Sequence, residues 1–151
     1  MNKKVQDIVF VELEDLRIRI SDNIQSSGRQ ASGRTAKSMH TEKSNAGATL
    51  LGRRAFASLE TGRKPGKVPS GFYRIIQQWV IDKGISFDSV SKRNSFAYLV
   101  SRKIAREGTK LYRDGSASDV YSKEIPTAIR RIKEKLGAFI KTKVEHINLN
   151  K

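Results

Sequence analysis

The sequence contains no cysteine, and this absence excludes disulfides, thiolate metal ligands and a cysteine nucleophile. Histidine is scarce too, because only His40 and His146 are present, and neither has other ligands at metal-binding spacing. We therefore expect no metal site and no bound cofactor. A fold without disulfides suits a reducing compartment such as the cytoplasm.

Long apolar runs are also missing from the amino-terminal stretch. Residues 1–20 include apolar side chains, but Asp7, Glu12, Glu14 and Asp15 interrupt them. This pattern excludes a signal-peptide core and a membrane span there. We expect a soluble chain that has no membrane partner and is not exported by that route.

Acidic residues are few in comparison with basic ones. The chain has 30 Lys and Arg against 15 Asp and Glu, which gives a net charge of +15. Such an excess repels itself and costs folding free energy, so we expect a polyanionic partner to offset it. Nucleic acid is the partner that this balance most often indicates, and an acidic protein face or an anionic membrane surface are the alternatives.

The size and apolar content of the chain limit the number of domains that it can form. With 151 residues, of which 37% are hydrophobic, the sequence supports one modest core rather than two independent ones. We expect a single domain over residues 1–151, with basic loops at about residues 25–38 and 61–69.

Apolar residues fall three or four positions apart in several segments, which predicts amphipathic helices. The first helix covers residues 5–24. A short helix follows Ser70 as N-cap and ends near Gly84, and another follows Ser95 and ends at Gly108.

The last helix is predicted from the apolar spacing over residues 125–147. Pro126 fits only near its first turn, and Gly137 weakens its middle by about 1 kcal/mol relative to alanine. Its apolar stripe suggests either a subunit interface or ordinary packing against the first helix, and both readings stay open. The candidate interface residues are Ile132, Leu136, Phe139 and Ile140.

The segments between the helices are predicted to be loops and one hairpin. Residues 21–39 are small, polar and glycine-containing, which indicates a flexible or partner-ordered loop. Residues 41–44 and 48–51 read as two strands joined by a turn at residues 45–47. Residues 61–69 hold two of the three prolines and form a second basic loop.

No segment assembles a recognisable active site. The glycines of the run from Gly62 to Lys67 are too close together for a nucleotide-binding Walker motif, and Val68 follows the lysine. The carboxylates of Glu12, Glu14 and Asp15 lie on an amphipathic helix, where solvated ion pairing explains them. We therefore expect a protein that is not an enzyme, and a nuclease is disfavoured because no metal-binding carboxylate cluster is visible.

Basic residues gather in and between the two predicted loops. Residues 28–67 hold nine Lys or Arg against two acidic residues. Cationic loops contact a phosphate backbone without reading bases, although solvated loops that only maintain solubility are the alternative. Aromatic residues do not interleave with them, so base stacking is poorly supported. The candidates for a DNA-facing or partner-facing surface are Arg29, Arg34, Lys37, Arg53, Arg54, Arg63, Lys64 and Lys67.

Four segments occur in an order that is typical of one protein family. They are SGRTAKSM at residues 32–39, FASLETGR at 56–63, IIQQWVIDKGI at 75–85 and FAYLVSRKIAREGTK at 96–110. Placed between an amphipathic first helix and a terminal helix, they make the sequence resemble the tail-completion and head–tail connector proteins of tailed bacteriophages. The resemblance covers roughly residues 5–147. Phe56 stands where the family pattern has tyrosine, and the loops are more basic than is typical.

The resemblance implies an α+β fold, in which a curled antiparallel sheet is flanked by a long N-terminal helix, two short helices and a long C-terminal helix. It implies a structural virion protein of the neck or tail, made in the bacterial host cytoplasm. Such a protein forms a ring of on the order of six or twelve copies around the DNA passage.

The partners implied are neighbouring portal, neck or tail proteins and, without sequence preference, the genomic DNA. The basic loops would line the passage or bind an acidic neighbouring ring, and the sequence does not choose between these. The alternative reading is a free-standing, sequence-independent nucleic-acid-binding protein.

Overall fold

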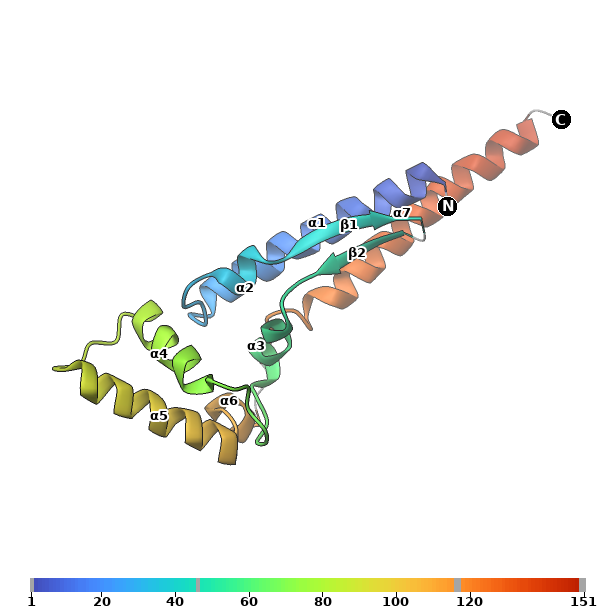
Figure 1. Ribbon diagram of the computed structural model, residues 1–151. Helices are drawn as coiled ribbons and strands as arrows, with labels where there is room; N and C mark the ends of the chain where they lie inside the picture. The colour runs from blue at the N-terminus through green and yellow to red at the C-terminus, as the bar shows by residue number, and fades with distance from the viewer. Residues whose placement is uncertain (1, 46, 116–117, 150–151) are drawn as a thin grey trace.

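The computed structural model describes residues 2–45, 47–115 and 118–149. The molecule is elongated and has two parts (Figure 1). One part consists of two long helices and a pair of strands, and the other is built mainly from two shorter helices.

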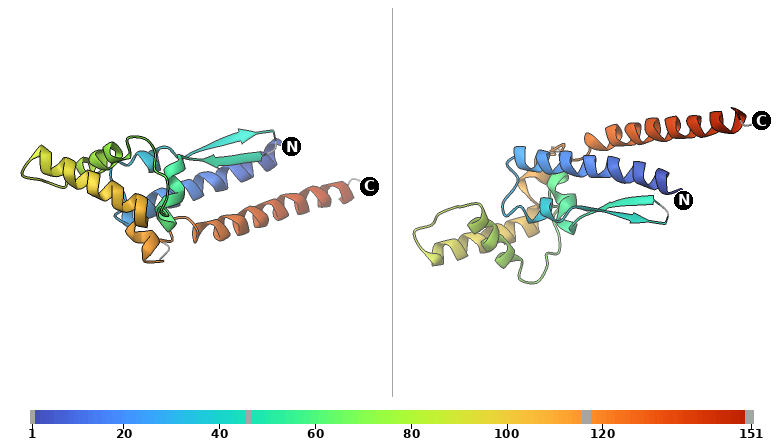
Figure 2. Two further views of the ribbon diagram at one scale, coloured as in Figure 1. Left: turned by 60° about the horizontal axis from the view of Figure 1, so that its bottom comes forward. Right: turned by 90° about the horizontal axis from the view of Figure 1, so that it is seen from above.

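The first part is a layered arrangement around the N-terminal helix α1 (Lys3–Ser26). The C-terminal helix α7 (Glu124–Leu149) lies along one side of α1 and runs in the opposite direction. A hairpin of β1 (His40–Ser44) and β2 (Gly47–Leu51) lies along the other side (Figure 2). The α+β fold predicted from the sequence, with long helices at both ends of the chain, is therefore confirmed.

The amphipathic pattern of α1 positions the larger apolar cluster. Leu16, Ile20 and Ile24 recur at the four-residue spacing of one helix face, and all three are buried. They pack with Met39, Val120, Ala128 and partly buried neighbours. This cluster joins α1 to the hairpin, to the segment before α7 and to the start of α7.

The two strands pair antiparallel, and Thr41 lies opposite Leu50. The hairpin predicted from the sequence is confirmed, with each strand one residue longer at one end. Asn45 is in the turn, whereas Ala46, also assigned to the turn, lies outside the described residues.

The second part is a helical hairpin of α4 (Phe72–Asp82) and α5 (Val90–Glu107). Its buried cluster contains Ile76, Val80 and Ala97 and is separate from the cluster around α1. The buried apolar residues thus form two small clusters where the composition suggested one core. The division follows from the path of the chain, which leaves the α1 layer before α4 and returns to it only after α5.

Two predicted N-caps differ from the structure. The N-cap of α5 is Ser89, whose side chain accepts a hydrogen bond from the Lys92 N–H at 3.2 Å, so Ser95 lies inside the helix. The first turn of α5 is mostly polar and gives no apolar signal. The N-cap of α4 is Gly71, at φ 70°, with no side-chain capping bond, and Ser70 precedes it.

Several segments predicted to be irregular contain short helices. The helix α1 continues to Ser26, and α2 occupies four residues of the predicted loop at 25–38, so that loop is shorter than expected. The short helices are α2 (Arg34–Lys37), the 3-10 helix η1 (Arg54–Phe56), α3 (Ala57–Thr61) and α6 (Lys110–Arg113). Helices this short bury too few side chains to show an apolar period in the sequence.

A buried carboxylate ties α3 to the segment that precedes α7. Glu60 is only 3% exposed, and its side chain accepts hydrogen bonds from the backbone N–H groups of Tyr121 and Ser122 at 3.0 and 3.2 Å. The Ser118 N–H donates to the Glu60 carbonyl at 3.0 Å. The Phe56 ring also stacks on the Tyr121 ring, with centroids 4.9 Å apart.

Helix α7 is longer than the surface that α1 offers it. At one end of the contact between the two helices, Arg19 of α1 pairs with Glu124 of α7. Near the other end, the Lys4 ammonium of α1 lies 5.8 Å from the centre of the Phe139 ring of α7. Beyond this point α7 continues past the beginning of α1 (Figures 1 and 2). Residues 140–147 are all exposed, and we call this segment the α7 overhang.

Candidate functional site

The smaller part of the molecule and the segment that links it to the hairpin surround a hollow of about 1000 Å³, here named the apolar groove. Helices α3, α4, α5 and α6 and the loop at residues 62–69 contribute to its walls. Its apolar surface comes from Phe72, Ile75, Trp79, Ile104 and Tyr112, among others. A hollow of this size, lined largely by apolar side chains, is typical of a binding surface.

The floor of the groove is a second apolar face of α4. One face of this helix packs on α5 through Ile76 and Val80. The adjoining face carries Ile75 and Trp79, which are 54% and 39% exposed. Large apolar side chains that remain this exposed on adjacent turns mark a surface with no partner within the described chain.

The edge of the groove is cationic. Arg54, Arg63 and Lys64 are among its lining residues, and no aspartate or glutamate is among the described residues that line it. The side chains of Arg54 and Lys64 are exposed and form no hydrogen bond or ion pair with any other described residue. A low-dielectric apolar wall beside unpaired cations strengthens the local positive potential.

Arg63 is held more firmly than its two neighbours on the edge. It is half-buried, its Nη2 donates to the Lys67 carbonyl at 2.7 Å, and its guanidinium lies 5.5 Å from the centre of the Phe72 ring. This cation therefore both shapes the loop and covers part of the apolar floor.

The loop at residues 62–69 is anchored and does not hang free. The Arg63 N–H donates to the Thr109 hydroxyl and the Thr109 N–H donates to the Arg63 carbonyl, each at 2.9 Å. The Gly66 N–H donates to the Ala105 carbonyl at 2.8 Å. These bonds fix the loop against the carboxyl end of α5, so its cations are presented on a rigid support.

A second, smaller hollow of about 320 Å³ adjoins the groove, and we call it the arginine hollow. Arg29, Arg34 and Arg53 line it. Arg34 Nη2 lies 3.3 Å from an Asp82 carboxylate oxygen, and this ion pair joins α2 to the end of α4. The two hollows share Ala55 and Ser58 on one side and Ile75 and Trp79 on the other.

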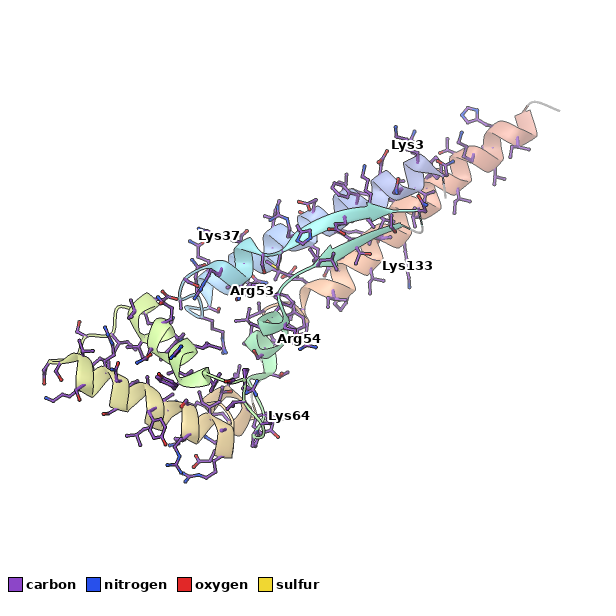
Figure 3. All side chains as sticks on the ribbon, in the orientation of Figure 1. Lys3, Lys37, Arg53, Arg54, Lys64 and Lys133 are labelled. Carbon is purple, nitrogen blue, oxygen red and sulfur yellow. The ribbon has the colours of Figure 1, made fainter. Side chains whose placement is uncertain are left out.

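The structure gathers most of the basic residues that the sequence singled out. Six of the eight line one or other hollow, and Lys37 and Lys67 line neither. Figure 3 shows Arg53, Arg54 and Lys64 following one another down the middle of the molecule, whereas Lys133 lies on α7. The convergence arises because the segments that follow α1 and β2, and the loop at residues 62–69, all line hollows that share Ile75 and Trp79 of α4.

Sequence reasoning missed the apolar half of this site. Ile75 and Trp79 have the spacing of buried helix positions, so spacing alone predicts that they lie on the packed face of α4. A signal was available, because Phe72, Ile75, Ile76, Trp79, Val80 and Ile81 span a wider arc than one partner helix covers.

The four candidate interface residues of α7 fall into two groups. Ile132, Leu136 and Phe139 are half-buried, on the part of the helix that runs beside α1. Ile140 is 58% exposed because it lies in the overhang. Val144 and Ile147, at 50% and 65% exposure, continue its stripe.

His40 lies on the hairpin, and Glu12 and Asp15 lie between α1 and α7. Hydrogen bonds to the Ser38 carbonyl and then to Glu42 raise the pKa of His40, whose ring lies exposed on the hairpin. Glu12 is buried against Lys135, and Asp15 pairs with Arg131 at 2.7 Å, so these carboxylates join α1 to α7. Within the described ranges no group of three or more His, Cys, Asp or Glu residues could hold a metal ion.

None of the described helices combines the length and the apolarity that crossing a membrane requires. No protein-family model matches the chain, and no solved structure matches it.

Proposed function

We propose that this protein is a structural subunit that assembles into a ring in the neck or tail of a tailed bacteriophage, where it joins portal to tail around the DNA passage. The α7 overhang is the observation that supports assembly into an oligomer. Ile140, Val144 and Ile147 lie at helical spacing and are each at least 50% exposed. A helix end that exposes a continuous apolar stripe is stabilised when another chain covers it.

The proposal of a ring in the neck or tail rests on the order of sequence segments, which resembles that of tail-completion and head–tail connector proteins. The charge supports a location beside a polyanion, because a net charge of +15 on one subunit is multiplied in a ring and needs neutralising. DNA in the passage or an acidic neighbouring ring would supply that neutralisation. In this function the protein acts by binding and not by catalysis.

The assembly is tested by sedimentation of the purified protein without DNA. We expect an oligomer, and we expect the double variant Ile140→Glu/Val144→Glu to sediment as a monomer with unchanged helical circular dichroism. The helix should survive because both side chains are already exposed. Val90→Glu, at a residue that is 63% exposed on α5, serves as the matched control and should leave the oligomer intact. A wild-type protein that remains a monomer at all concentrations contradicts the proposal.

A free-standing, sequence-independent nucleic-acid-binding protein is the second candidate. The convergence of six basic residues on two adjoining hollows favours it. This function predicts a monomer that binds duplex DNA in the absence of any other protein, with an affinity that falls steeply as salt rises. The same sedimentation experiment, repeated with DNA over a salt series, separates the two functions.

A further inference from the structure

We propose that the apolar groove is the docking site for an acidic amphipathic segment of a neighbouring protein. This inference rests on the proposed function as an assembly subunit and names the chemistry of one partner. Three properties of the groove carry it: an uncovered apolar floor, a cationic edge and a rigid frame.

The floor fits the apolar face of an amphipathic segment. Ile75 and Trp79 stand one helical turn apart, and Phe72 lies one turn before Ile75. Helix-in-groove recognition uses apolar anchors at this spacing on both partners. Covering a half-exposed tryptophan and isoleucine removes apolar surface from water, which is the main favourable term in such docking.

The edge selects the charge of the occupant. Arg54, Arg63 and Lys64 border the floor, and no described lining residue is acidic. An occupant with carboxylates beside its apolar anchors would neutralise these cations, whereas a basic occupant would be repelled.

A second copy of this chain has little negative surface to offer. At least ten of its 15 acidic side chains already form ion pairs with lysine or arginine of the same chain. Glu60 is buried and bonded to backbone N–H groups. The exposed stripe of the α7 overhang is flanked by Lys141 and Lys143, which would meet the cations of the groove. The acidic occupant therefore comes from another protein.

The frame is rigid enough to select a shape. Hydrogen bonds between Arg63 and Thr109 hold one side of the groove to α5, and the Gly66 bond to Ala105 extends that anchor. Binding therefore orders little of the protein, which lowers the entropic cost of docking.

The chain carries its own reporter for this site. Trp79 is the single tryptophan, and it lines the groove at 39% exposure. An apolar occupant that covers its ring should shift its fluorescence to shorter wavelength and protect it from acrylamide quenching. Occupants bound away from both the groove and the arginine hollow, which shares Trp79, should leave the Trp79 emission unchanged.

The probes are synthetic amphipathic peptides of about 18 residues, which is five helical turns. One has a leucine face and a glutamate face, the second has the same leucine face with lysine in place of glutamate, and the third has the leucine and glutamate order scrambled. We expect the first to shift and protect the full-chain Trp79 signal and the other two to leave it unchanged.

Two groove variants and one control locate the binding. Arg54→Ser/Lys64→Ser removes two exposed cations of the edge and should weaken the leucine–glutamate peptide about tenfold. Ile75→Glu places charge on the floor and should abolish binding, while folding survives because that side chain is 54% exposed. Lys3→Ser/Lys133→Ser removes two exposed cations outside the groove and should bind like the unaltered protein.

Each contrary result overturns the inference. If the lysine peptide or the scrambled peptide binds equally well, or if no peptide changes the Trp79 signal, the groove does not bind an acidic amphipathic segment. A DNA oligonucleotide that quenches Trp79 and displaces the peptide assigns the groove to nucleic acid. Quenching protection that grows with protein concentration alone assigns it to a second copy.

Sedimentation of the same samples keeps this inference apart from the proposed function. If the protein is an oligomer and the acidic peptide does not bind the groove, the docking site is refuted and the assembly proposal is unaffected. A monomer that binds the peptide at the groove retains the docking site and contradicts the ring.

Discussion

Gly62 and Gly108 fix how the loop at residues 62–69 meets the end of α5. Their φ angles are 73° and 81° with extended ψ, a backbone region almost restricted to glycine. A Cβ at Gly62 would lie 2.5 Å from the Thr109 hydroxyl oxygen, and one at Gly108 would lie 2.7 Å from the Arg63 carbonyl oxygen. Both clashes fall on the pair of hydrogen bonds that anchors the loop.

Gly62→Ala and Gly108→Ala should each lower the free energy of unfolding by about 1–3 kcal/mol, because alanine strains the backbone at both positions. Urea denaturation measures the change. Gly137→Ala is the control, since a Cβ there would meet no described atom within 4 Å apart from its chain neighbours and the backbone of its own helix, and it should raise the free energy of unfolding by up to about 1 kcal/mol. Tolerance of alanine at residues 62 and 108 would mean that the loop is not held as described.

Among the elements, α1 and α7 are matched by charge as well as by apolar packing. Glu12 is 3% exposed, and Lys135 of α7 is its cation partner. Asp15 pairs with Arg131 one turn further along. Because one carboxylate is buried, this ladder fixes the alignment of the two helices more firmly than exposed pairs would.

Lys135→Ala should lower the free energy of unfolding by about 1–3 kcal/mol, because it leaves the Glu12 carboxylate buried without its cation. Lys133→Ala, an exposed neighbour with no ion pair among the described residues, should change stability by less than about 0.5 kcal/mol. Thermal unfolding followed by circular dichroism compares them. The double variant Glu12→Leu/Lys135→Leu should recover most of the loss, and equal effects of the two single variants would refute the role of the pair.

The sequence predicted the helices whose burial imposes a period, because α1, α4, α5 and α7 repeat their apolar residues often enough to be recognised. The hairpin was indicated by its turn residues instead, and α2, α3 and α6 are too short to show a period. The start of α5 was placed at Ser95 because the turn after Ser89 is polar. The cations of the site were found from their density, but its apolar floor was not, because spacing alone does not distinguish a buried Trp79 from a half-exposed one.

On the scale of the whole molecule, the two apolar clusters are joined by hydrogen bonds and ion pairs more than by shared packing. The larger cluster centres on α1, and the smaller one on Val80 between α4 and α5. Lys83 donates to the Gly28 carbonyl at 2.6 Å, and Arg34 pairs with Asp82, across the space between the two parts. Links of this kind are weaker than packed apolar surface.

Val80→Ala should therefore loosen the smaller part selectively. The side chain is fully buried, so its truncation should cost about 2 kcal/mol, and hydrogen exchange of α4 and α5 amides should accelerate. Amides of α1 should keep their protection. Leu16→Ala, in the larger cluster, should accelerate exchange in α1 first. Uniform acceleration throughout the chain in both variants would show that the clusters unfold as one unit.

The shared walls of the two hollows have a mechanical consequence. Ala55 and Ser58 stand on one side, and Ile75 and Trp79 stand on the other. Any swing of α4 toward or away from this wall changes the width of both hollows together. A molecule that pushes α4 away from this wall in one hollow would therefore widen the other hollow as well.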